Sequence, residues 1–265
     1  KWLTITSAYG KPSDNILTGI VNGIKIAFLP RHGKNHNLLP SNINYRANID
    51  CLKSLGVTDI ISLSAVGSLK ESLKPGDFVI VDQFIDRTYA RKKTFFDDGI
   101  VAHVSLAKPV SEQLTKIILK SAPDNINIHK KGTYLAMEGP QFSTLAESNL
   151  YRSWNCDVIG MTNMPEAKLA REAEIAYATI AMVTDYDCWH PDHDAVTVDN
   201  IIKVLNNNAS NAKSLVLNIL KHIAKNDWDW NDPAYFALED AVITPVEARP
   251  QETLLKLKNI LKRLN

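Results

Sequence analysis

The chain is short of cysteine, of unbalanced charge and of long apolar runs. Its 265 residues include three scattered cysteines, Cys51, Cys156 and Cys188, and this odd set gives no disulfide framework. With 30 basic and 29 acidic residues the net charge is +1, so no nucleic-acid or membrane surface is expected. No apolar run approaches the roughly 18 residues of a membrane span, and no basic-then-apolar signal pattern opens the chain. These absences indicate a reduced, cytoplasmic protein.

The order of apolar segments predicts an α/β fold. Expected strands cover residues 16–21, 24–29, 58–64, 77–85, 132–137, 157–160 and 175–184, with Asn22-Gly23 as a hairpin turn. Expected helices cover residues 44–55, 111–120, 143–154, 165–173, 198–224 and 251–264. This alternation favours a mixed central sheet flanked by helices, in a single domain over residues 1–265. Ligands of such sheets collect at one edge, beyond the strand ends.

Two aspartates follow the most apolar expected strand. Asp185 and Asp187 come directly after Ile-Ala-Tyr-Ala-Thr-Ile-Ala-Met-Val-Thr, and in an extended segment their carboxylates would share a face. Acids that emerge from a buried strand indicate a ligand rather than a role in solubility. Metal binding is one alternative, but no clear third ligand lies nearby. The polar cluster that comes next is interpreted as a loop: His190, Asp192, His193 and Asp194.

Two strand ends carry groups suited to an anion. Arg31 and His32 follow the strand over residues 24–29, and an arginine fork with a histidine donor suits phosphate. A solvated loop is the plain alternative. Ser64 and Ala65 open a small-residue stretch, interpreted as a loop, that could bring N–H groups and a hydroxyl to the same anion. Small residues after a strand are often only a turn, so this signal is weak by itself.

A Met-Thr pair precedes the helix expected to begin near Pro165, because proline suits a first turn. The Thr162 hydroxyl and nearby N–H groups could hold an anion at this helix start. Met161 would then be an apolar floor for a sugar, although a lone methionine is more often core. Asn163 as a simple helix cap is the alternative.

Five motifs resemble the 5′-methylthioadenosine phosphorylases, which belong to the trimeric purine nucleoside phosphorylase family. They are RHGKNHNLLPSNINYRANI, GSLKESLKPGDFVIVDQFIDRT, EGPQFSTLAES, MTNMPE and ATIAMVTDYDCW, and the similarity runs in order over roughly Gly10 to Leu220. The resemblance implies a purine nucleoside phosphorylase-like fold. It also implies phosphorolysis of 5′-methylthioadenosine to adenine and 5-methylthioribose 1-phosphate, in purine and methionine salvage. Inorganic phosphate would be a co-substrate, with no metal and no organic cofactor.

The resemblance also implies a role for each matching residue. Phosphate would be held by Arg31, His32, Ala65, Thr162 and Ser64, where the family usually has threonine. Purine and ribose would be held by Phe142, Ser143, Met161, Asp185 and Asp187. The methylthio group would meet Val198, Ile201 and, from a neighbouring subunit of a homotrimer, His103. Asp185 and Asp187 would be the catalytic residues and would bond N7 and the 6-amino edge of the purine. To donate to N7, Asp185 would have to be protonated, with its pKa raised by burial and by its carboxylate neighbour.

One departure from the family leaves alternatives open. Lys1-Trp-Leu-Thr aligns after the family's first strand and Gly-rich phosphate turn, so either the sequence is incomplete there or the phosphate site is weakened. A phosphorylase for 5′-methylthioinosine or another purine nucleoside is one alternative, which Asp185 and Asp187 disfavour. A purine-binding protein without a complete phosphate site is another. A hydrolytic nucleosidase is disfavoured because Arg31, His32 and Thr162 describe an anion site.

Overall fold

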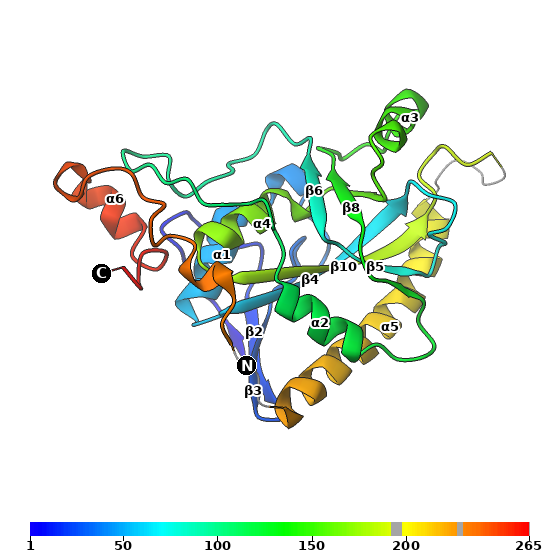
Figure 1. The fold of residues 1–265 in the computed structure, drawn as a ribbon, viewed down its shortest axis with the longest axis horizontal. Coiled ribbons are helices and arrows are strands. Elements are labelled where there is room, and N and C mark those ends of the chain that lie inside the picture. Colours follow the sequence, from blue (N-terminus) through cyan, green and yellow to red (C-terminus); the bar gives the residue numbers. More distant parts are fainter. Residues whose placement is uncertain (192–197, 227–229, 265) are drawn as a thin grey trace.

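The chain folds into two β-sheets, and helices cover both faces of the larger one (Figure 1). This computed structural model describes residues 1–191, 198–226 and 230–264. The strands are β1 (Trp2–Leu3), β2 (Ile16–Val21), β3 (Ile24–Phe28), β4 (Asp59–Ser68), β5 (Phe78–Ile80), β6 (Gln83–Asp86), β7 (Ile128–His129), β8 (Thr133–Ala136), β9 (Val158–Gly160) and β10 (Ala176–Asp185). The helices are α1 (Tyr45–Ser54), α2 (Glu112–Lys120), α3 (Leu145–Ser153), α4 (Asn163–Glu172), α5 (Val198–Lys225) and α6 (Gln251–Lys256), with short 3₁₀ turns η1 (Pro40–Asn42), η2 (Pro233–Phe236) and η3 (Val246–Ala248).

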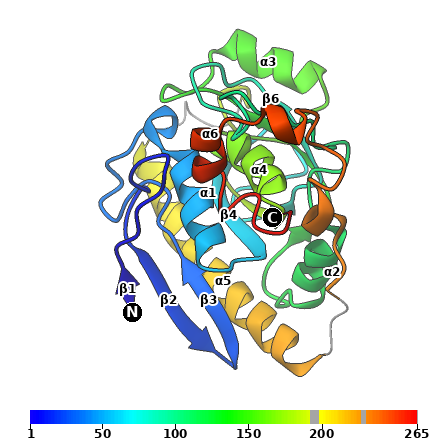
Figure 2. The ribbon, with the colours of Figure 1, turned by 90° about the vertical axis from the view of Figure 1, so that its left-hand side faces the viewer.

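The larger sheet has seven strands in the order β6-β8-β9-β4-β10-β5-β7 and mixes parallel with antiparallel neighbours. The smaller sheet is antiparallel, and Asn22 and Gly23 close its hairpin with φ of 51° and 82°, as a two-residue turn requires. This hairpin lies beside the carboxyl end of α5 (Figures 1 and 2). The predicted fold class, a mixed central sheet flanked by helices, is confirmed. The expectation of one domain over residues 1–265 stays a prediction.

Strand β10 lies at the centre of the larger sheet, and nine of its ten residues are buried. Ala181 and Val183 join the cluster formed with α1 and α4 on one face. Ile180 and Met182 join the cluster formed with α2 and α5 on the other. Because side chains alternate along a strand, a strand covered on both faces has to be apolar throughout. This explains the long apolar run that precedes Asp185.

The single strand expected over residues 77–85 is wrong, because the structure has β5 and β6 in different parts of the sheet. Between them the backbone N–H of Val81 donates to Thr179 O on β10, and that of Asp82 donates to Gly132 O ahead of β8. The Asp82 carboxylate in turn accepts from the Gly132 N–H at 3.0 Å. The chain therefore crosses between two parts of a curled sheet at this point.

Two other boundaries also differ from expectation. Strand β4 continues to Ser68 where the sequence predicts a loop after Ser64, because the residues keep pairing with β10 and the last two also pair with β9. Helix α6 ends at Lys256 instead of reaching residue 264. The turns that follow still bury Leu257 and Ile260, both 0% exposed, so the expected apolar face of this segment is present.

Glu172, the last residue of α4, is buried and fixes an irregular segment. Its carboxylate accepts from the Thr94 hydroxyl and from the Phe95 N–H, each at 2.7 Å. Burial nevertheless raises the pKa of Glu172 from an ordinary 4.5 to about 7, because these two hydrogen bonds only partly offset the desolvation. A group whose folded pKa is raised contributes its full stability below its unfolded pKa and loses it as pH rises through the folded pKa. The loss therefore falls between pH 4.5 and about 7.

We predict that Glu172→Gln removes this pH dependence. An amide keeps one acceptor for the Phe95 N–H, offers a donor to the Thr94 hydroxyl and never ionises. Urea unfolding at pH 5 and pH 8 should show the native protein losing on the order of a few kcal/mol more than the variant. Glu112→Gln, at the exposed start of α2, is the control and should follow the native curve. Parallel curves for the native protein and Glu172→Gln would contradict the prediction.

Candidate active site

A cavity of about 570 Å³ lies beside the second half of β4, where β9 and β10 flank that strand. This volume is in the range of small-molecule sites. Apolar wall comes from the segment before α1 and from α5. Nine residues predicted from the sequence line the cavity: Arg31, His32, Ser64, Ala65, Phe142, Met161, Thr162, Asp185 and Asp187. Residues from five separate segments of the chain therefore meet in one place.

Asp185 ends β10 at one end of the cavity. Its Oδ2 accepts from the Thr184 hydroxyl at 2.7 Å, and its Oδ1 accepts from the Asp187 N–H at 2.8 Å. Burial raises the pKa of Asp185, and the neighbouring Asp187 charge raises it further, against these two hydrogen bonds. A Cβ added at Gly67 on β4 would lie 3.0 Å from Asp185 Oδ1, so this glycine leaves the carboxyl its space. The direction of the pKa shift agrees with the expectation from the sequence.

Asp187 reaches the same cavity by a different route from the one predicted. It lies beyond the strand and has φ of 53°, so the two carboxylates do not share one extended face. Asp187 is 8% exposed, and its Oδ2 has no hydrogen-bond partner among the described residues. Burial raises the pKa of Asp187, and the nearby hydroxyl groups of Ser148 and Ser143 partly offset this rise. An unpartnered buried oxygen of this kind is an acceptor that a bound ligand would satisfy.

Phe142 and Ser143 belong to the turn between β8 and α3. Phe142 lines the cavity and is 48% exposed, which leaves a ring face free for stacking. Ser143 is buried behind it, beside Met137 and Asp187, and does not line the cavity itself. Gly139 has φ of 67°, and a Cβ there would collide with Met161 Sδ. This turn therefore has to be made by glycine for Met161 to reach the cavity.

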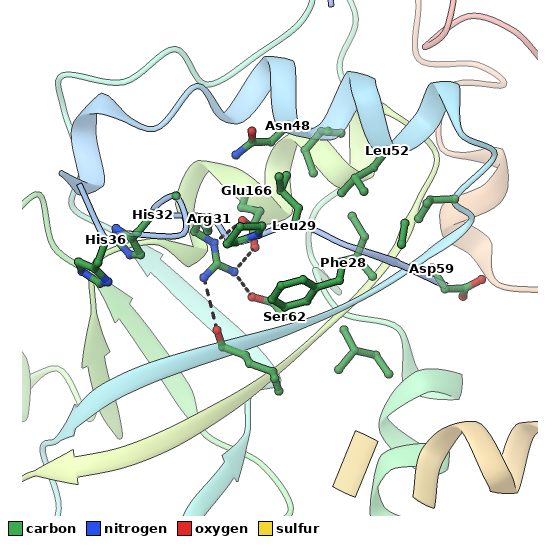
Figure 3. A pocket seen from close by; sticks show the side chains of 18 residues that line it. Phe28, Leu29, Arg31, His32, His36, Asn48, Leu52, Asp59, Ser62 and Glu166 are labelled. Carbon is green, nitrogen blue, oxygen red and sulfur yellow. Dashed lines mark hydrogen bonds and ion pairs between the residues drawn. The ribbon is translucent and has the colours of Figure 1, made fainter. Parts of the chain in front are cut away.

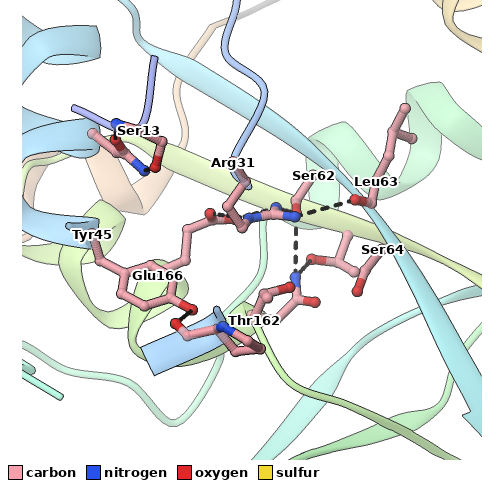
Figure 4. Close-up of polar contacts among 12 residues, drawn as sticks. Ser13, Arg31, Tyr45, Ser62, Leu63, Ser64, Thr162 and Glu166 are labelled. Carbon is pink, nitrogen blue, oxygen red and sulfur yellow. Dashed lines mark hydrogen bonds and ion pairs between the residues drawn. The ribbon is translucent and has the colours of Figure 1, made fainter. Parts of the chain in front are cut away.

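Arg31 follows β3 at the other end of the cavity, and most of its donors are used within the protein (Figure 4). Its Nε and Nη2 donate to Glu166 at 2.6 and 2.8 Å, Nη2 also donates to the Ser62 hydroxyl, and Nη1 donates to Leu63 O at 3.4 Å. A guanidinium has five N–H donors. These four bonds leave one Nη1 donor for a ligand, so Arg31 offers an anion one hydrogen bond and a charge rather than a full fork.

His32 lies next to Arg31 and stacks on His36, with ring centroids 4.3 Å apart. Its Nδ1 is 2.8 Å from Leu38 O. A carbonyl oxygen only accepts, so Nδ1 carries the proton, and in the neutral ring Nε2 is an acceptor. Burial lowers the pKa of His32, which favours this neutral form. A donor to phosphate was expected here, but the neutral ring offers an acceptor for a P–OH group.

Two hydroxyls complete this end of the cavity. Thr162 is the N-cap of α4, yet its side chain makes no capping hydrogen bond and lines the cavity. Ser64 has only long contacts, at 3.3 Å to the Tyr134 hydroxyl and 3.5 Å to Ala65 O. Both hydroxyls are therefore free to turn toward a ligand. The regular part of α4 begins after Met164, whose φ of −119° is not helical, as the proline signal predicted.

A buried polar network beneath Arg31 was not predicted from the sequence. Glu166 accepts from Arg31 and from the Tyr177 hydroxyl at 2.8 Å, and burial alone would raise its pKa. The Arg31 charge and the hydrogen bonds from Arg31, Tyr177 and Ser62 together outweigh burial and lower the pKa of Glu166. Asn163 is no helix cap, because its Nδ2 donates to Tyr177 and Thr179 at 2.6 Å each. The one signal for this network was the acid in the MTNMPE motif, read only as part of the resemblance.

A second cavity, of about 380 Å³, lies behind Arg31 between β3, β4 and α1, and Figure 3 shows Arg31 and Glu166 on its wall. On this side residues 59–66 of β4 pair with no strand in the described ranges, since β9 reaches only Gly67 and Ser68. Whether the sequence is incomplete at its start or the phosphate site is weakened stays open, as in the sequence analysis.

The other predicted residues lie outside the cavity or outside the described residues. His103 is exposed, and its N–H bonds to Ala241 O, where residues 101–103 run beside residues 241–243. Val198 and Ile201 lie on the first turn of α5, but their side chains are outside the described residues. Three members of the expected loop are outside them as well: Asp192, His193 and Asp194.

The described ranges contain no group of three or more His, Cys, Asp or Glu side chains placed to hold a metal ion. Asp185 and Asp187 therefore have no third ligand among these residues. No helix in the same ranges is long and apolar enough to cross a membrane.

Residues 5–221 match the phosphorylase superfamily. The S-methyl-5′-thioadenosine phosphorylase of Rhodospirillum rubrum is 56% identical over 265 residues, which is 100% of this chain and 90% of that protein. The S-methyl-5′-thioadenosine phosphorylase of Synechocystis is 52% identical over 98% of this chain and 80% of its own length. These similarities cover the whole cavity described above.

Solved structures give the same family. The crystal structure of a methylthioadenosine phosphorylase from an antarctic soil metagenomic library is 51% identical, covers 98% of this chain and 92% of its own, and superposes with a TM-score of 0.93. The methylthioadenosine phosphorylase of Schistosoma mansoni in complex with adenine is 36% identical, covers 86% of each chain and superposes with a TM-score of 0.82. The chain thus belongs to the phosphorylase superfamily and, within it, to the S-methyl-5′-thioadenosine phosphorylases.

Proposed function

We propose that this protein cleaves 5′-methylthioadenosine with inorganic phosphate and releases adenine and 5-methylthioribose 1-phosphate. Relatives at 50–56% identity over nearly the full chain are S-methyl-5′-thioadenosine phosphorylases. Phosphate is a co-substrate of this family, which uses no cofactor. The observation that carries the proposal is the arrangement of polar groups in the cavity. Buried acids lie at one end, and an arginine with free hydroxyls lies at the other.

The chemistry follows from these two ends. A phosphate oxygen attacks C1′ and forms the new C1′–O bond while the C1′–N9 bond breaks. The bonding electrons leave with the purine, and the negative charge is neutralised when protonated Asp185 gives its proton to N7. Asp185 then regains a proton from solvent. A donor at N7 stabilises the departing base more in the transition state than in the ground state, which is the requirement for catalysis.

The phosphate end is built to bind an anion that still carries a proton. The free Nη1 donor of Arg31 and the hydroxyls of Ser64 and Thr162 would donate to phosphate oxygens. The Nε2 of neutral His32 would accept from the remaining P–OH group. Ala65 would bring its backbone close to the same anion. Attack on C1′ then starts from a phosphate that is held on several sides.

The purine end favours a 6-amino base over a 6-oxo base. Within the part of the chain that the structure describes, Asp187 Oδ2 is an acceptor without a partner, and an exocyclic amino group is a donor. A 6-oxo group would meet this oxygen with another acceptor, which disfavours 5′-methylthioinosine. Phe142 would stack on the base, Ser143 would support the acids from behind, and Met161 would lie under the ribose. Val198 and Ile201 would meet the methylthio group.

The proposal includes a homotrimer in the cytoplasm. His103 is exposed in the single chain and lies outside the cavity, so it would serve a site only across an interface between subunits. Val101 and Ile243, 44% and 61% exposed, flank it on the paired segments 101–103 and 241–243. These apolar neighbours suit a buried contact between subunits.

We expect adenine release from 5′-methylthioadenosine to require phosphate. The assay compares release with and without phosphate, and compares 5′-methylthioadenosine with 5′-methylthioinosine at equal concentrations. Release that does not depend on phosphate would indicate hydrolysis instead. Binding of the nucleoside without any turnover would favour the binding-only alternative. Faster cleavage of 5′-methylthioinosine would reverse the proposed base preference.

We expect Asp185 to set the upper pH limit of turnover. As pH rises above the raised pKa of Asp185, the proton for N7 is lost and kcat falls. Asp185→Ala removes the donor and should lower kcat by about a hundredfold. Asp185→Asn donates at every pH and should flatten the alkaline limb. Asp98→Asn, at a surface ion pair, is the control. An alkaline limb that is unchanged in Asp185→Asn would exclude this role.

We expect Thr162→Val to weaken phosphate binding selectively. Valine has a similar shape but lacks the hydroxyl, and a hydrogen bond to a charged group is worth about 1.5–3 kcal/mol. The KM for phosphate should therefore rise roughly tenfold or more, while the KM for 5′-methylthioadenosine changes little. Thr58→Val, outside the cavity, is the matched control. Equal rises in both KM values would show that Thr162 does not act on phosphate alone.

A further inference from the structure

Arg91 is a buried cation that no step of the reaction uses. Its side chain is 1% exposed, in the irregular segment after β6. Arginine stays charged in proteins, so burying it without partners would be costly. The groups that bind Arg91 therefore identify the segments that this charge holds in place.

Those partners are mainly backbone carbonyls from two segments of the cavity. Nη1 donates to Met161 O and, at 2.7 Å, to Met164 O. Nη2 donates to Glu138 O at 2.7 Å and to Met137 O at 3.5 Å. One planar group thus binds both the chain that leads to Thr162 and the chain that leads to Phe142.

The position of Arg91 corresponds to the point where two neighbouring strands separate. β8 and β9 run parallel up to Ala136 and Gly160, and the Met137 N–H still donates to Gly160 O at 2.9 Å. Beyond this bond the two chains diverge, one toward the base end of the cavity and one toward its phosphate end. Beyond it, carbonyl oxygens of both chains accept hydrogen bonds from the guanidinium of Arg91.

Glu138 extends the same cluster to two further segments. Its Oε2 accepts from the N–H groups of Tyr89 and Ala90 at 2.6 and 3.3 Å, and its Oε1 accepts from the Ser41 hydroxyl. The Arg91 Nε lies 3.5 Å from Glu138 Oε1 and donates to Ser41 at 3.3 Å. Ser41 follows Leu39 and Pro40, which line the cavity. The pair therefore binds three walls of the site at once.

We infer that Arg91, supported by Glu138, is a positioning residue that sets the spacing between the phosphate end and the base end of the active site. Phosphorolysis needs phosphate and C1′ at bonding distance while the base is held by the aspartates. Each half-site can bind its own ligand without this spacing, but the reaction cannot proceed. Displacements of about 1 Å can cost roughly a hundredfold in rate.

Lysine cannot replace arginine in this position. A guanidinium offers five coplanar donors, whereas an ammonium offers three from one point. Arg91→Lys keeps the charge but cannot bind the carbonyls of both diverging chains. The test therefore compares Arg91→Lys with Arg263→Lys. Arg263 lies far from the cavity, and its guanidinium donates two hydrogen bonds to the buried carboxylate of Glu174, which lysine cannot reproduce.

The inference rests on the proposed function, so the native protein is assayed first for phosphate-dependent adenine release. Turnover, adenine binding and phosphate binding are then measured for each variant, the last two by calorimetry with each ligand alone, together with the unfolding temperature. We expect Arg91→Lys to bind adenine and phosphate separately like the native protein and to lose on the order of a hundredfold in kcat. Arg263→Lys should lose stability but keep native kcat.

Three results would overturn the inference. They are native kcat in folded Arg91→Lys, an equal loss of kcat in Arg263→Lys, and loss of both separate ligands in Arg91→Lys. If Arg91→Lys does not fold, Glu138→Gln replaces it, since this change keeps the shape and removes the charge next to Arg91. That variant should also lose kcat while each ligand still binds. An inactive native protein would refute the proposed function instead.

Discussion

The parallel pairing of β4 with β10 at the centre of the sheet is the constraint on which the site depends. Its register places Ser64 beside Ala181, and Asp185 beside Gly67 after a shift of one residue. Because β10 is buried on both faces, it cannot slip along β4 without moving apolar side chains out of the core. The relative position of Ser64 and Asp185 on these two strands therefore follows from the hydrophobic core.

The site nevertheless requires ionisable groups in that core, and the structure stabilises them in two ways. At the phosphate end Glu166 and Arg31 neutralise each other and are completed by hydroxyls and an amide, which keeps both charged. At the base end burial, together with the neighbouring Asp187 charge, raises the pKa of Asp185 and favours the protonated acid. One fold thus keeps one acid ionised and another able to donate, as the two halves of the reaction require.

The irregular segments around the cavity are ordered by polar contacts rather than by regular secondary structure. Arg91 and Glu138 bind the carbonyls and N–H groups of chains that have left the sheet. Glu172 does the same for the segment at Phe95. Buried backbone groups in such segments need partners, and charged side chains supply several at once. This explains why Arg91 is buried beside the site without taking part in the chemistry.

The sequence by itself determined the fold class and most element positions, because apolar periodicity and strand ends are local signals. Together with the motifs of the family resemblance, it also identified nine residues of the cavity. It did not reveal that β5 and β6 are separate strands or that Asp187 has a positive φ. Nor did it reveal that Arg31 donates to Glu166 or that Arg91 binds two walls of the site. Each of these depends on partners from distant parts of the chain, which no local pattern identifies. The tertiary structure decided which donors and acceptors remain free for a ligand, since that is settled only when every other hydrogen bond has been made.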